Sequence, residues 1–461
     1  MLLGVLAGVA AEGGGSAPGL PLVCQRLARV DDDAWPVFNM ASFDQDKVRT
    51  FGDFQYSPYW DADKTLVVAR RDLRDNTVQT VRLEGRTLTV NPRDGHRNTV
   101  VGVSPADGRL HLSWDHHCNP LRYGASRAGF LTSPPAAMTA ADFEPPRPLL
   151  PGSELESMAT YPRFLNNPGG ALHFIYRQGA SGGGDTYVYR YAAESHAWIR
   201  VGTTHLFSRR GSYAPWENSR TRNAYLNDTL FDAQGRLHVT WCYRESGATW
   251  ASNHDLHYAY SDDGGATWRN NAGAVIADLP KGNPIELADP GIVVQPIPVF
   301  SWLMNQTAMC IDRTGQPHVV TFHLAAPERP VGKLAHDPPP EIGARLSLFH
   351  YWRTPDRTWH SSGPVMPLRT RPGILCDRDD NLIVYYAAGG KVSVHIALSR
   401  SGWQSWRHGE IALDGVSLVD VSKPDLGRMA RDGVLSFALV TAEAGGRRGF
   451  ALADFALLPV P

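Results

Sequence analysis

A short turn followed by an alternating, aromatic-rich strand recurs along the chain. The motif has the form D-x-x-G-x-L-H-h-x-W, where h is apolar, and its seven variants begin at residues 61, 106, 168, 233, 313, 378 and 431. Alternation of apolar and polar positions after each turn is typical of a β-strand. Equivalent strand positions lie 44 to 80 residues apart, a spacing that suits four-stranded blades. The pattern predicts an all-β fold, namely a seven-bladed β-propeller of four-stranded antiparallel blades.

The repeats account for most of the chain, which favours one domain. Residues 36–60 are expected to begin the first blade, and GFALADFALL at 449–458 is expected to close the ring against it. SDDGGATW at 261–268 matches the Asp-box, a hairpin turn whose Trp packs between blades. The insertions 271–300 and 325–345 are expected to be surface loops of the fifth blade. We therefore predict a single propeller domain over residues 30–461.

The chain begins with a short apolar run, LLGVLAGVA at 2–10, followed by small residues and a Gly-rich stretch. This arrangement resembles the apolar core and cleavage zone of a secretory signal, although neither Lys nor Arg precedes it. Residues 1–20 are interpreted as a signal-like or linker segment, and the protein is expected to be secreted or periplasmic. No apolar run in the sequence is long enough to cross a bilayer.

Four histidines occupy the same position of the repeated strand: His111, His173, His238 and His318. A residue type that recurs at one place in a structural repeat is explained by packing between neighbouring repeats. We therefore interpret these four as blade-packing histidines rather than as ligands.

Other histidines flank both ends of a predicted hairpin. The runs 98–104 and 109–115 alternate as strands, His96 precedes the first, and His116 and His117 follow the second. Because the outer ends of two antiparallel strands lie side by side, these imidazoles are expected to converge at one rim of the fold.

Two further strand ends carry polar side chains. Tyr161 precedes one predicted strand and Arg177 ends the next, so the same hairpin geometry brings them to one rim. A later stretch, SRTRNAYLNDTL, adds Tyr225 with Arg222 nearby. Each of these residues alone could equally be an amphipathic rim residue or part of a loop anchor.

Together, DGHRN, HLSWDHHCNPLRY, TYPRF, FIYRQGASGGGD and RNAYLN resemble the BNR-4-type seven-bladed propeller polysaccharide lyases, which comprise ulvan lyases and related rhamnose–glucuronate lyases. The resemblance extends from GDFQY at 52–56 to the last blade, and the residue spacings also fit. It implies a polysaccharide lyase with an anionic polysaccharide substrate. The family's site residues fall on His96, His116, Tyr161 and Arg177, with Tyr225 as a substrate contact. His117 and Arg222 are further candidates for substrate binding. Either member of the 116–117 pair can take the catalytic place, and the spacing selects His116.

These residue types suit β-elimination at a uronic acid, in which the C5 proton is removed and the O4 substituent leaves. Arg177 is expected to neutralise the carboxylate, because a guanidinium stays charged and binds carboxylates bidentately. Tyr161 is expected to be the acid, His116 the base, and His96 an orienting group. An alternative assignment gives Tyr161 both proton transfers.

Composition narrows the range of partners. The 45 Lys and Arg residues nearly balance the 46 Asp and Glu, so no global field attracts nucleic acid or a membrane. We expect neither as a partner, and we expect a monomer. The five Cys residues are odd in number, widely spaced and without a CxxC pair, which favours buried free thiols.

The expected chemistry requires no cofactor. Related lyases nevertheless imply a structural Zn or Ca ion. Candidate zinc ligands on adjacent repeats are Cys242, His254, His257, Cys310 and His323, although they lack the short spacing of common zinc motifs. Calcium bound by loop carboxylates is an equal alternative.

Two other functions remain open from the sequence. A propeller α-L-rhamnosidase, a glycoside hydrolase acting on rhamnosyl-glucuronate, would give saturated products. A non-catalytic glycan-binding propeller would use the same rim Tyr, Trp and Arg residues, because a fold does not determine a function.

Overall fold

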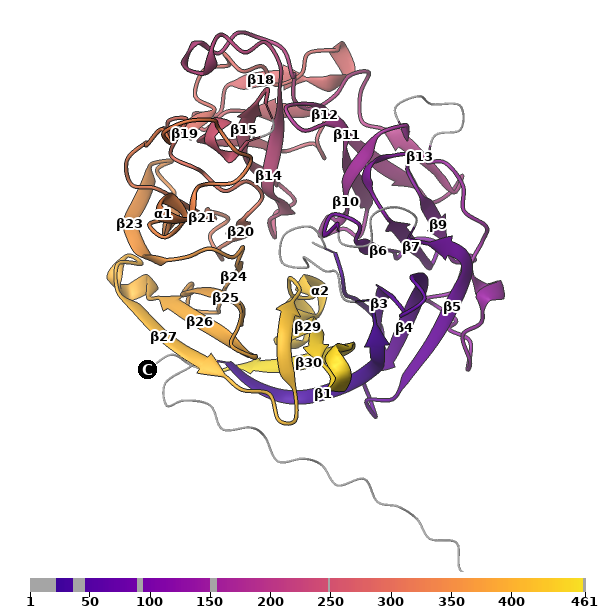
Figure 1. The fold of residues 1–461 in the computed structure, drawn as a ribbon. Helices are drawn as coiled ribbons and strands as arrows, with labels where there is room; N and C mark the ends of the chain where they lie inside the picture. Colours follow the sequence, from indigo (N-terminus) through magenta and orange to yellow (C-terminus); the bar gives the residue numbers. More distant parts are fainter. Residues whose placement is uncertain (1–21, 36–45, 89–93, 150–155, 248, 459–461) are drawn as a thin grey trace, which may run out of the picture.

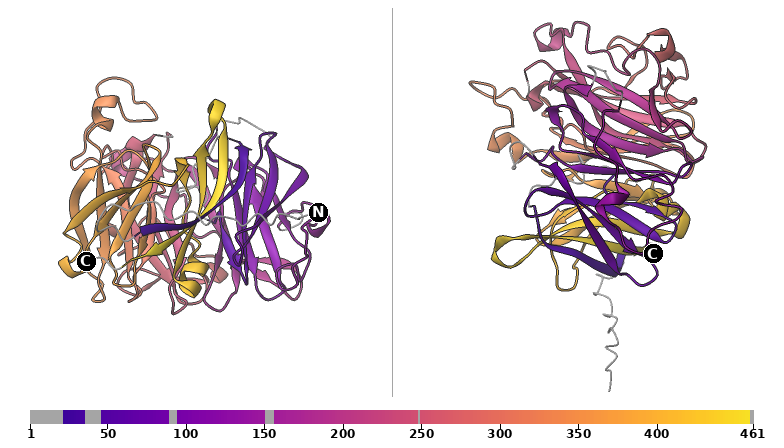
Figure 2. Two further views of the ribbon diagram at one scale, coloured as in Figure 1. Left: turned by 90° about the horizontal axis from the view of Figure 1, so that it is seen from below. Right: turned by 90° about the vertical axis from the view of Figure 1, so that its right-hand side faces the viewer.

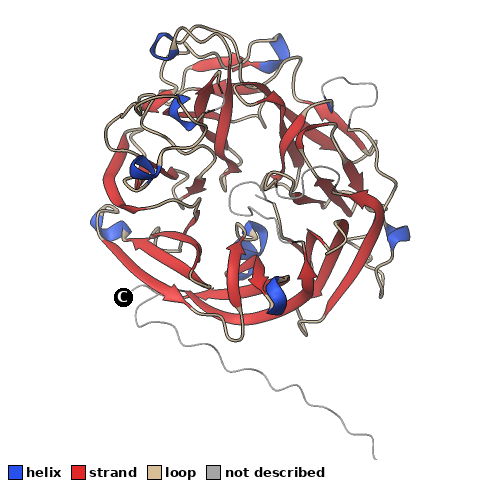
Figure 3. Cartoon of the chain, in the orientation of Figure 1, coloured by secondary structure: helices blue, strands red, loops and turns tan. Residues whose placement is uncertain are grey.

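Antiparallel sheets follow one another around a central axis in sequence order, and the part of the chain that the structure describes contains seven of them (Figure 1). The computed structural model describes residues 22–35, 46–88, 94–149, 156–247 and 249–458. The expected signal-like segment at 1–20 lies outside these residues. Strands dominate, and the helices are short (Figure 3). This architecture confirms the predicted all-β, seven-bladed β-propeller.

Each blade begins with a strand near the axis and proceeds outward. The first three blades consist of β2 (Arg49–Phe51), β3 (Phe54–Trp60), β4 (Thr65–Asp72) and β5 (Val78–Thr87); β6 (Thr99–Ser104), β7 (Arg109–Trp114) and β9 (Tyr123–Ala125); and β10 (Ala159–Asn166), β11 (Leu172–Ala180), β12 (Gly183–Ala192) and β13 (Ala197–Arg200), with β8 (His117–Asn119) beside β10. The fourth blade contains β14 (Arg222–Phe231), β15 (Leu237–Glu245), β16 (Asn253–Ser261), β17 (Thr267–Arg269), β18 (Val275–Asp278) and β19 (Val293–Gln295).

The last three blades complete the ring. They consist of β20 (Ala308–Ile311), β21 (Pro317–His323), β22 (Ser347–Arg353) and β23 (Trp359–Pro367); β24 (Gly373–Cys376), β25 (Leu382–Ala388), β26 (Lys391–Ala397) and β27 (Trp406–Ile411); and β28 (Ser417–Val421), β29 (Val434–Ala442), β30 (Arg448–Leu457) and β1 (Leu22–Ala34). The α-helices are α1 (Pro340–Gly343) and α2 (Leu426–Asp432). In the described part of the chain, no helix is long and apolar enough to cross a membrane.

The number of strands per blade varies around the expected four. Four blades have four strands, the second has three, and the third and fourth have five and six among the described residues. In the second blade, isolated bridges from Tyr123 to Arg147 and from Ser126 to Phe143 take the place of an outer strand. The extra strand of the third blade, β8, lies in sequence between β7 and β9 of the second blade but pairs with β10. It carries His117.

The repeated turn explains why one strand of each blade could be located from the sequence: the second strand in six blades and the third, β4, in the first blade. Each turn places one residue in the left-handed region, where a side chain is unfavourable, and glycine fills it in five copies, for example Gly108 with φ 66° and Gly235 with φ 89°. Lys64 and Asp380 take this position in the two copies without glycine, with φ 65° and 57°. Because the turn chemistry is local, the following strand begins at the predicted place each time.

The ring closes differently from the prediction. The segment 449–458 lies in β30, which pairs with β29 on one side and β1 on the other. Closure therefore uses β1, which begins at Leu22, upstream of residue 30, and forms the outermost strand of the last blade rather than joining the first. Figure 1 shows β1 in indigo beside β30 in yellow, and the side views in Figure 2 show β1 along the outside of the ring.

Packing between blades follows the pattern expected from the repeat. The four repeat histidines are buried, and the rings of three of them contact an aromatic ring of the next blade: His111 with Tyr191 at 4.5 Å, His173 with Phe231 at 5.1 Å and His318 with Trp403 at 4.7 Å. The Asp-box forms the turn between β16 and β17, with Trp268 fully buried. The insertion 271–300 belongs to the fourth blade, however, because it contains β18 and β19. Only 325–345 lies in the fifth.

Candidate active site

The expected site residues gather on the face of the propeller where the innermost strands begin. Tyr161 lies near the start of β10 and Tyr225 near the start of β14, while Arg177 lies near the end of β11. Because Thr160 pairs with Arg177 across the antiparallel sheet, the end of β11 lies beside the start of β10. This is the convergence predicted for Tyr161 and Arg177.

Arg177 lies between two phenol rings. Its guanidinium carbon is 4.9 Å from the ring centroid of Tyr161 and 5.9 Å from that of Tyr225, and the two rings meet edge to face at 6.0 Å. The ring of His96 lies 5.6 Å from that of Tyr161. A guanidinium over aromatic faces is stabilised by cation–π attraction and is held in a fixed orientation.

The charge of Arg177 has no carboxylate to balance it among the described residues. The side chain is only 4% exposed, and Nη2 donates to Thr160 Oγ1 at 3.1 Å, whereas Nε and Nη1 find no hydrogen-bond partner in the described part of the chain. Arg163, which lines a pocket with Arg177, is ion-paired with Asp228 at 3.1 Å. A buried cation with unused donors favours binding of an anion, because leaving such donors unpaired costs free energy.

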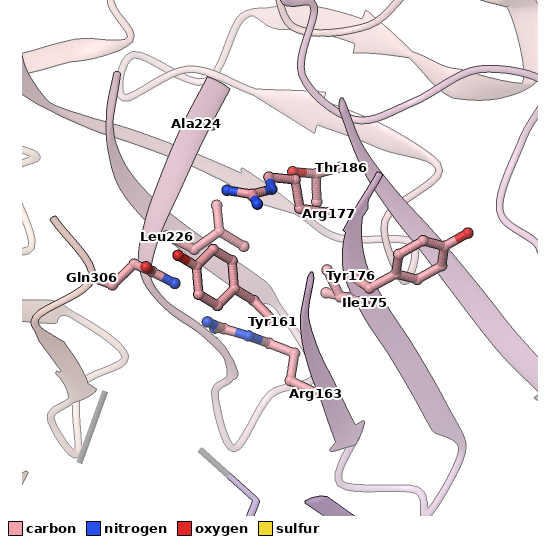
Figure 4. A pocket seen from close by; sticks show the side chains of 9 residues that line it. All are labelled: Tyr161, Arg163, Ile175, Tyr176, Arg177, Thr186, Ala224, Leu226 and Gln306. Carbon is pink, nitrogen blue, oxygen red and sulfur yellow. The ribbon is translucent and has the colours of Figure 1, made fainter. Parts of the chain in front are cut away.

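A pocket adjoins this group. Figure 4 shows the side chains of Arg177, Arg163 and Gln306 around the ring of Tyr161, with Tyr176 pointing away. The residues that line the pocket are Tyr161, Arg163, Ile175, Tyr176, Arg177, Thr186, Ala224, Leu226 and Gln306.

Two imidazoles stack beside Tyr161 and share one carboxylate. The rings of His96 and His117 are nearly parallel, with centroids 4.0 Å apart. Asp94 Oδ1 lies 2.6 Å from His96 Nδ1, and Asp94 Oδ2 lies 2.5 Å from His117 Nδ1. Both imidazoles are accessible, with 29% and 36% of the His96 and His117 side chains exposed. The predicted convergence of histidines at one rim therefore holds for this pair.

His116 points the other way. It is fully buried, and its Nε2 lies 3.1 Å from Ser113 Oγ and accepts from the Arg122 backbone N–H at 3.2 Å. Burial lowers the pKa of His116 to about 4, so the ring is neutral. The spacing had selected His116 as catalytic, but the structure brings its neighbour His117 to the other site residues.

Burial and charge affect the ionisable groups of the site differently. Burial raises the pKa of Tyr161 above its usual value, which keeps the phenol protonated. Burial also opposes ionisation of Tyr225, but Arg244 and Arg177 outweigh it and lower the pKa of that phenol. Burial and the adjacent His117 lower the pKa of His96 despite the opposing effect of Asp94. The site thus combines a protonated phenol with a neutral imidazole, an acid and a base.

Arg222 does not reach the site. Its guanidinium is fully buried and forms two hydrogen bonds with the Glu245 carboxylate, at 2.7 and 3.1 Å, and others with backbone carbonyls of the 209–211 loop. This corrects the expectation that Arg222 binds substrate, because Glu245 balances its charge and its remaining donors bind the 209–211 loop.

Sequence reasoning missed three residues around the tyrosine pair. Arg244 lies over the ring of Tyr225 at 4.6 Å and donates to Asn253 and Asn305. Asp94 and Gln306 were also missed. The sequence did contain a signal for Arg244. The Tyr-Arg pair formed by Tyr176 and Arg177 recurs one blade later as Tyr243 and Arg244.

The candidate metal ligands do not form one group. His254 and His257, together with Asp255, offer ligand atoms within 4.8 Å of one another. Cys242 lies outside that group, Cys310 Sγ lies 3.4 Å from Cys376 Sγ, and His323 bonds to Tyr351 and a backbone carbonyl. The five predicted ligands therefore reduce to His254 and His257.

The chain is similar in sequence to a known protein family and to ulvan lyases. Residues 54–364 match the family described as "BNR repeat-containing family member". The chain is 23% identical over 301 residues to the short isoform of ulvan lyase from Alteromonas sp. (strain LOR), covering 53% of the chain and 54% of that protein. It is 20% identical over 317 residues to the long isoform from Pseudoalteromonas sp. (strain PLSV), covering 60% of the chain and 31% of that protein. The chain thus spans about half or less of the length of these relatives.

Solved structures share the fold. The structure of the polysaccharide lyase Uly1 superposes with a TM-score of 0.69 at 15% identity, covering 95% of this chain and 100% of that one. A PL25 ulvan lyase bound to -[GlcA(1-4)Rha3S]- superposes with a TM-score of 0.65 at 14% identity, covering 93% and 95%.

Proposed function

The chain belongs to the BNR repeat-containing family, and from this premise we propose that it is a polysaccharide lyase that cleaves rhamnose–uronic acid linkages by β-elimination. Similarity to ulvan lyases supports the class of reaction. The observation that carries the proposal is Arg177, a buried guanidinium with unused donors between two phenols and beside a pair of imidazoles.

Substrate binding would begin at Arg177. A uronate carboxylate would accept from the unused Nη1 and from the second N–H of Nη2, in the end-on bidentate geometry that a guanidinium favours. Arg244, which has no ion-pair partner among the described residues, adds positive potential behind Tyr225. Negative charge that develops on the carboxylate as C5 loses its proton would be stabilised there, where water is excluded.

The proton transfers fall to His117 and Tyr161. We assign His117 as the base in place of His116, because His116 is fully buried whereas His117 is accessible and stacks on His96, which lies beside Tyr161. Its imidazole takes the C5 proton, the C4–O4 bond breaks as the C4–C5 double bond forms, and the Tyr161 phenol protonates the departing oxygen. The raised pKa of Tyr161 suits this role, since the phenol must carry a proton beforehand. Tyr225 is then a substrate contact.

A structural metal fits only one place that was expected from the sequence. His254, Asp255 and His257 provide two imidazoles and a carboxylate, and the buried His257 Nε2 has no partner among the described residues. Nitrogen-rich ligands favour zinc over calcium. Such an ion would link residues within β16 and would supply no chemistry to the elimination. Metal analysis of purified protein, with His257→Ala as the control, tests it.

Ultraviolet absorbance distinguishes the proposed elimination from the alternative functions. Purified protein is incubated with ulvan and, separately, with a rhamnose-capped glucuronate gum, and the ultraviolet band of a conjugated unsaturated uronate is followed. We expect the band to grow with ulvan and to stay flat with Arg177→Ala. Reducing sugar or free rhamnose without that band would instead establish a glycoside hydrolase, and binding without turnover would establish a glycan-binding propeller. Action on such a glycan also leads us to propose a secreted or periplasmic location.

A further inference from the structure

Asp94 contacts both imidazoles of the site at once. Its two carboxylate oxygens lie 2.6 and 2.5 Å from the Nδ1 atoms of His96 and His117, and the side chain is 11% exposed. The proposed reaction as described above uses the imidazoles but not this carboxylate.

The local backbone holds Asp94 in place. Asp94 Oδ1 also accepts the backbone N–H of His96 at 3.1 Å, which closes an Asx turn. Arg97 Nε lies 3.5 Å from Asp94 Oδ2, and the same guanidinium pairs with the buried Asp115 at 3.0 Å. The carboxylate is therefore anchored by its own turn and by a buried ion pair, independently of the imidazoles.

An ionised carboxylate only accepts hydrogen bonds, so each Nδ1 that faces Asp94 must carry a proton. Burial alone would raise the pKa of Asp94, but hydrogen bonds from His117 and His96 lower it well below its usual value, which keeps the group ionised. In a neutral imidazole, a proton on Nδ1 leaves Nε2 as the lone-pair atom on the far side of the ring.

We propose that Asp94 is a positioning residue that holds His96 and His117 in the Nδ1–H tautomer, so that the two stacked rings present their Nε2 atoms to the substrate. The kinetic part of this inference rests on the proposed function, whereas the tautomers do not. The stack at 4.0 Å keeps the two Nε2 atoms side by side, so that one can act as base while the other accepts a substrate hydroxyl.

The tautomers of His96 and His117 can be determined by NMR, without measuring enzymatic activity. Long-range ¹H–¹⁵N spectra of protein labelled at histidine distinguish protonated from unprotonated ring nitrogens, and His96→Ala and His117→Ala assign the two signals. We expect both rings to be protonated at Nδ1 at neutral pH. Protonation at Nε2 in both rings would overturn the proposal, and so would an Nδ1–H pattern that appears only after treatment with EDTA, because the three groups would then be a metal site in the untreated protein.

Asp94→Asn tests the kinetic role. The amide oxygen accepts from one Nδ1–H, but the amide NH₂ must donate to the other ring and moves that ring's proton to Nε2. We expect kcat to fall on the order of 10³-fold with KM little changed, since a wrong tautomer disables a base without removing the carboxylate site at Arg177. Unchanged kcat in a variant with one switched tautomer would overturn the kinetic role.

Asp107→Asn is the matched control. Asp107 Oδ2 likewise contacts a histidine Nδ1, that of His196 at 3.0 Å, and the hydroxyl of Tyr191, at 2.8 Å, outside the site. This variant should keep wild-type kcat. Should the wild-type protein process no glycan at all, the proposed function fails, while the tautomers in the spectra still decide whether Asp94 positions the two rings.

Discussion

Arg177 and Tyr161 form a cation–π pair in which the guanidinium carbon lies 4.9 Å from the phenol centroid. The pair is set by the register of β10 on β11, in which Thr160 is opposite Arg177. A carboxylate held on Arg177 therefore has the Tyr161 phenol directly beside it. This relationship links the anchoring group to the proposed acid without any loop movement.

Tyr161→Phe should abolish elimination while the fold persists. The substitution removes only the proton donor for the leaving oxygen, so we expect kcat to fall about 10²- to 10⁴-fold, measured by growth of the unsaturated uronate band on ulvan. Tyr176→Phe is the control, because Tyr176 points away from the pocket and its hydroxyl lies 3.1 Å from that of Tyr189. Equal activity in the two variants would remove Tyr161 from the reaction.

Substitutions of the adjacent residues His116 and His117 should have different effects, one on stability and the other on activity. His117→Ala removes an exposed imidazole next to Tyr161, and we expect a loss of kcat on the order of 10³-fold at unchanged thermal stability. His116→Ala removes a fully buried ring that bonds to Ser113 and to the Arg122 backbone, and should lower the unfolding temperature instead. The opposite result would restore the assignment that the spacing favoured.

The choice between these histidines shows where sequence reasoning stops. Strict alternation from His111 would continue through Ser113 and Asp115, but Asp115 adopts a left-handed conformation with φ 61° and ends the strand. The chain then crosses to the next blade as β8, with Cys118 also left-handed at φ 55°. A non-glycine residue at positive φ is not visible in a pattern of apolar and polar positions, so neither is the orientation of the residues that follow it.

Elements fixed by local chemistry were predictable. The repeated turn located one strand in each of the seven blades, and the ends of β10 and β11 brought Tyr161 and Arg177 together as hairpin geometry requires. Long-range pairing was not predictable in the same way. The strand β1 lacks the repeat motif, and its partner β30 lies more than 400 residues away in sequence. No local sequence pattern therefore predicts that these two strands close the ring. The role expected for Arg222 was wrong for a related reason, because its partner Glu245 lies on the neighbouring strand.

Arg177→Lys should fail although it preserves the charge. Lysine is a compact cation that cannot bind a carboxylate bidentately, so we expect kcat/KM to fall about 10²- to 10³-fold in the ulvan assay. Arg236→Lys is the matched control, since Arg236 lies over the ring of Tyr260 at 4.3 Å outside the site. Wild-type kcat/KM in Arg177→Lys would mean that charge alone is sufficient there.

Stability should fall in mild acid because several histidines are buried in the neutral form. Burial lowers the pKa of these histidines, for example to about 3 for His111 and about 4 for His116, His173, His257 and His323. Their folded pKa values lie below the unfolded value of 6.5, so the unfolded chain takes up protons first as the pH drops. Stability is thus full above pH 6.5 and decreases from there toward pH 4, by up to about 3 kcal/mol per group.

Urea unfolding at a series of pH values measures this loss. We expect the midpoint to decrease steadily below pH 6.5, and His116→Gln to show a shallower dependence by about one proton. A midpoint that is flat between pH 7 and pH 5 would contradict the neutral buried histidines. The measurement is independent of any glycan and so of the proposed reaction.

The last blade is tied to the first by a buried ionic group. Asp454 on β30 accepts paired hydrogen bonds from Arg71 on β4, at 2.8 and 2.9 Å, and from Arg428 on α2, at 2.7 and 2.9 Å. All three side chains are nearly inaccessible. The group spans the place where the two ends of the chain meet, so it reinforces the strand closure made by β1.

Asp454→Ala should therefore destabilise the whole propeller. It leaves two guanidinium groups buried without their anion, which costs about 3–5 kcal/mol when one partner of a buried ion pair is removed. Glu328→Ala is the control, because Glu328 pairs with Arg345 at an exposed position and its loss should change little. Chemical denaturation monitored by Trp fluorescence measures both variants. If the two lose similar stability, ring closure rests on the strand pairing of β1 with β30 alone, and deletion of β1 rather than loss of Asp454 would then be the change that opens the ring.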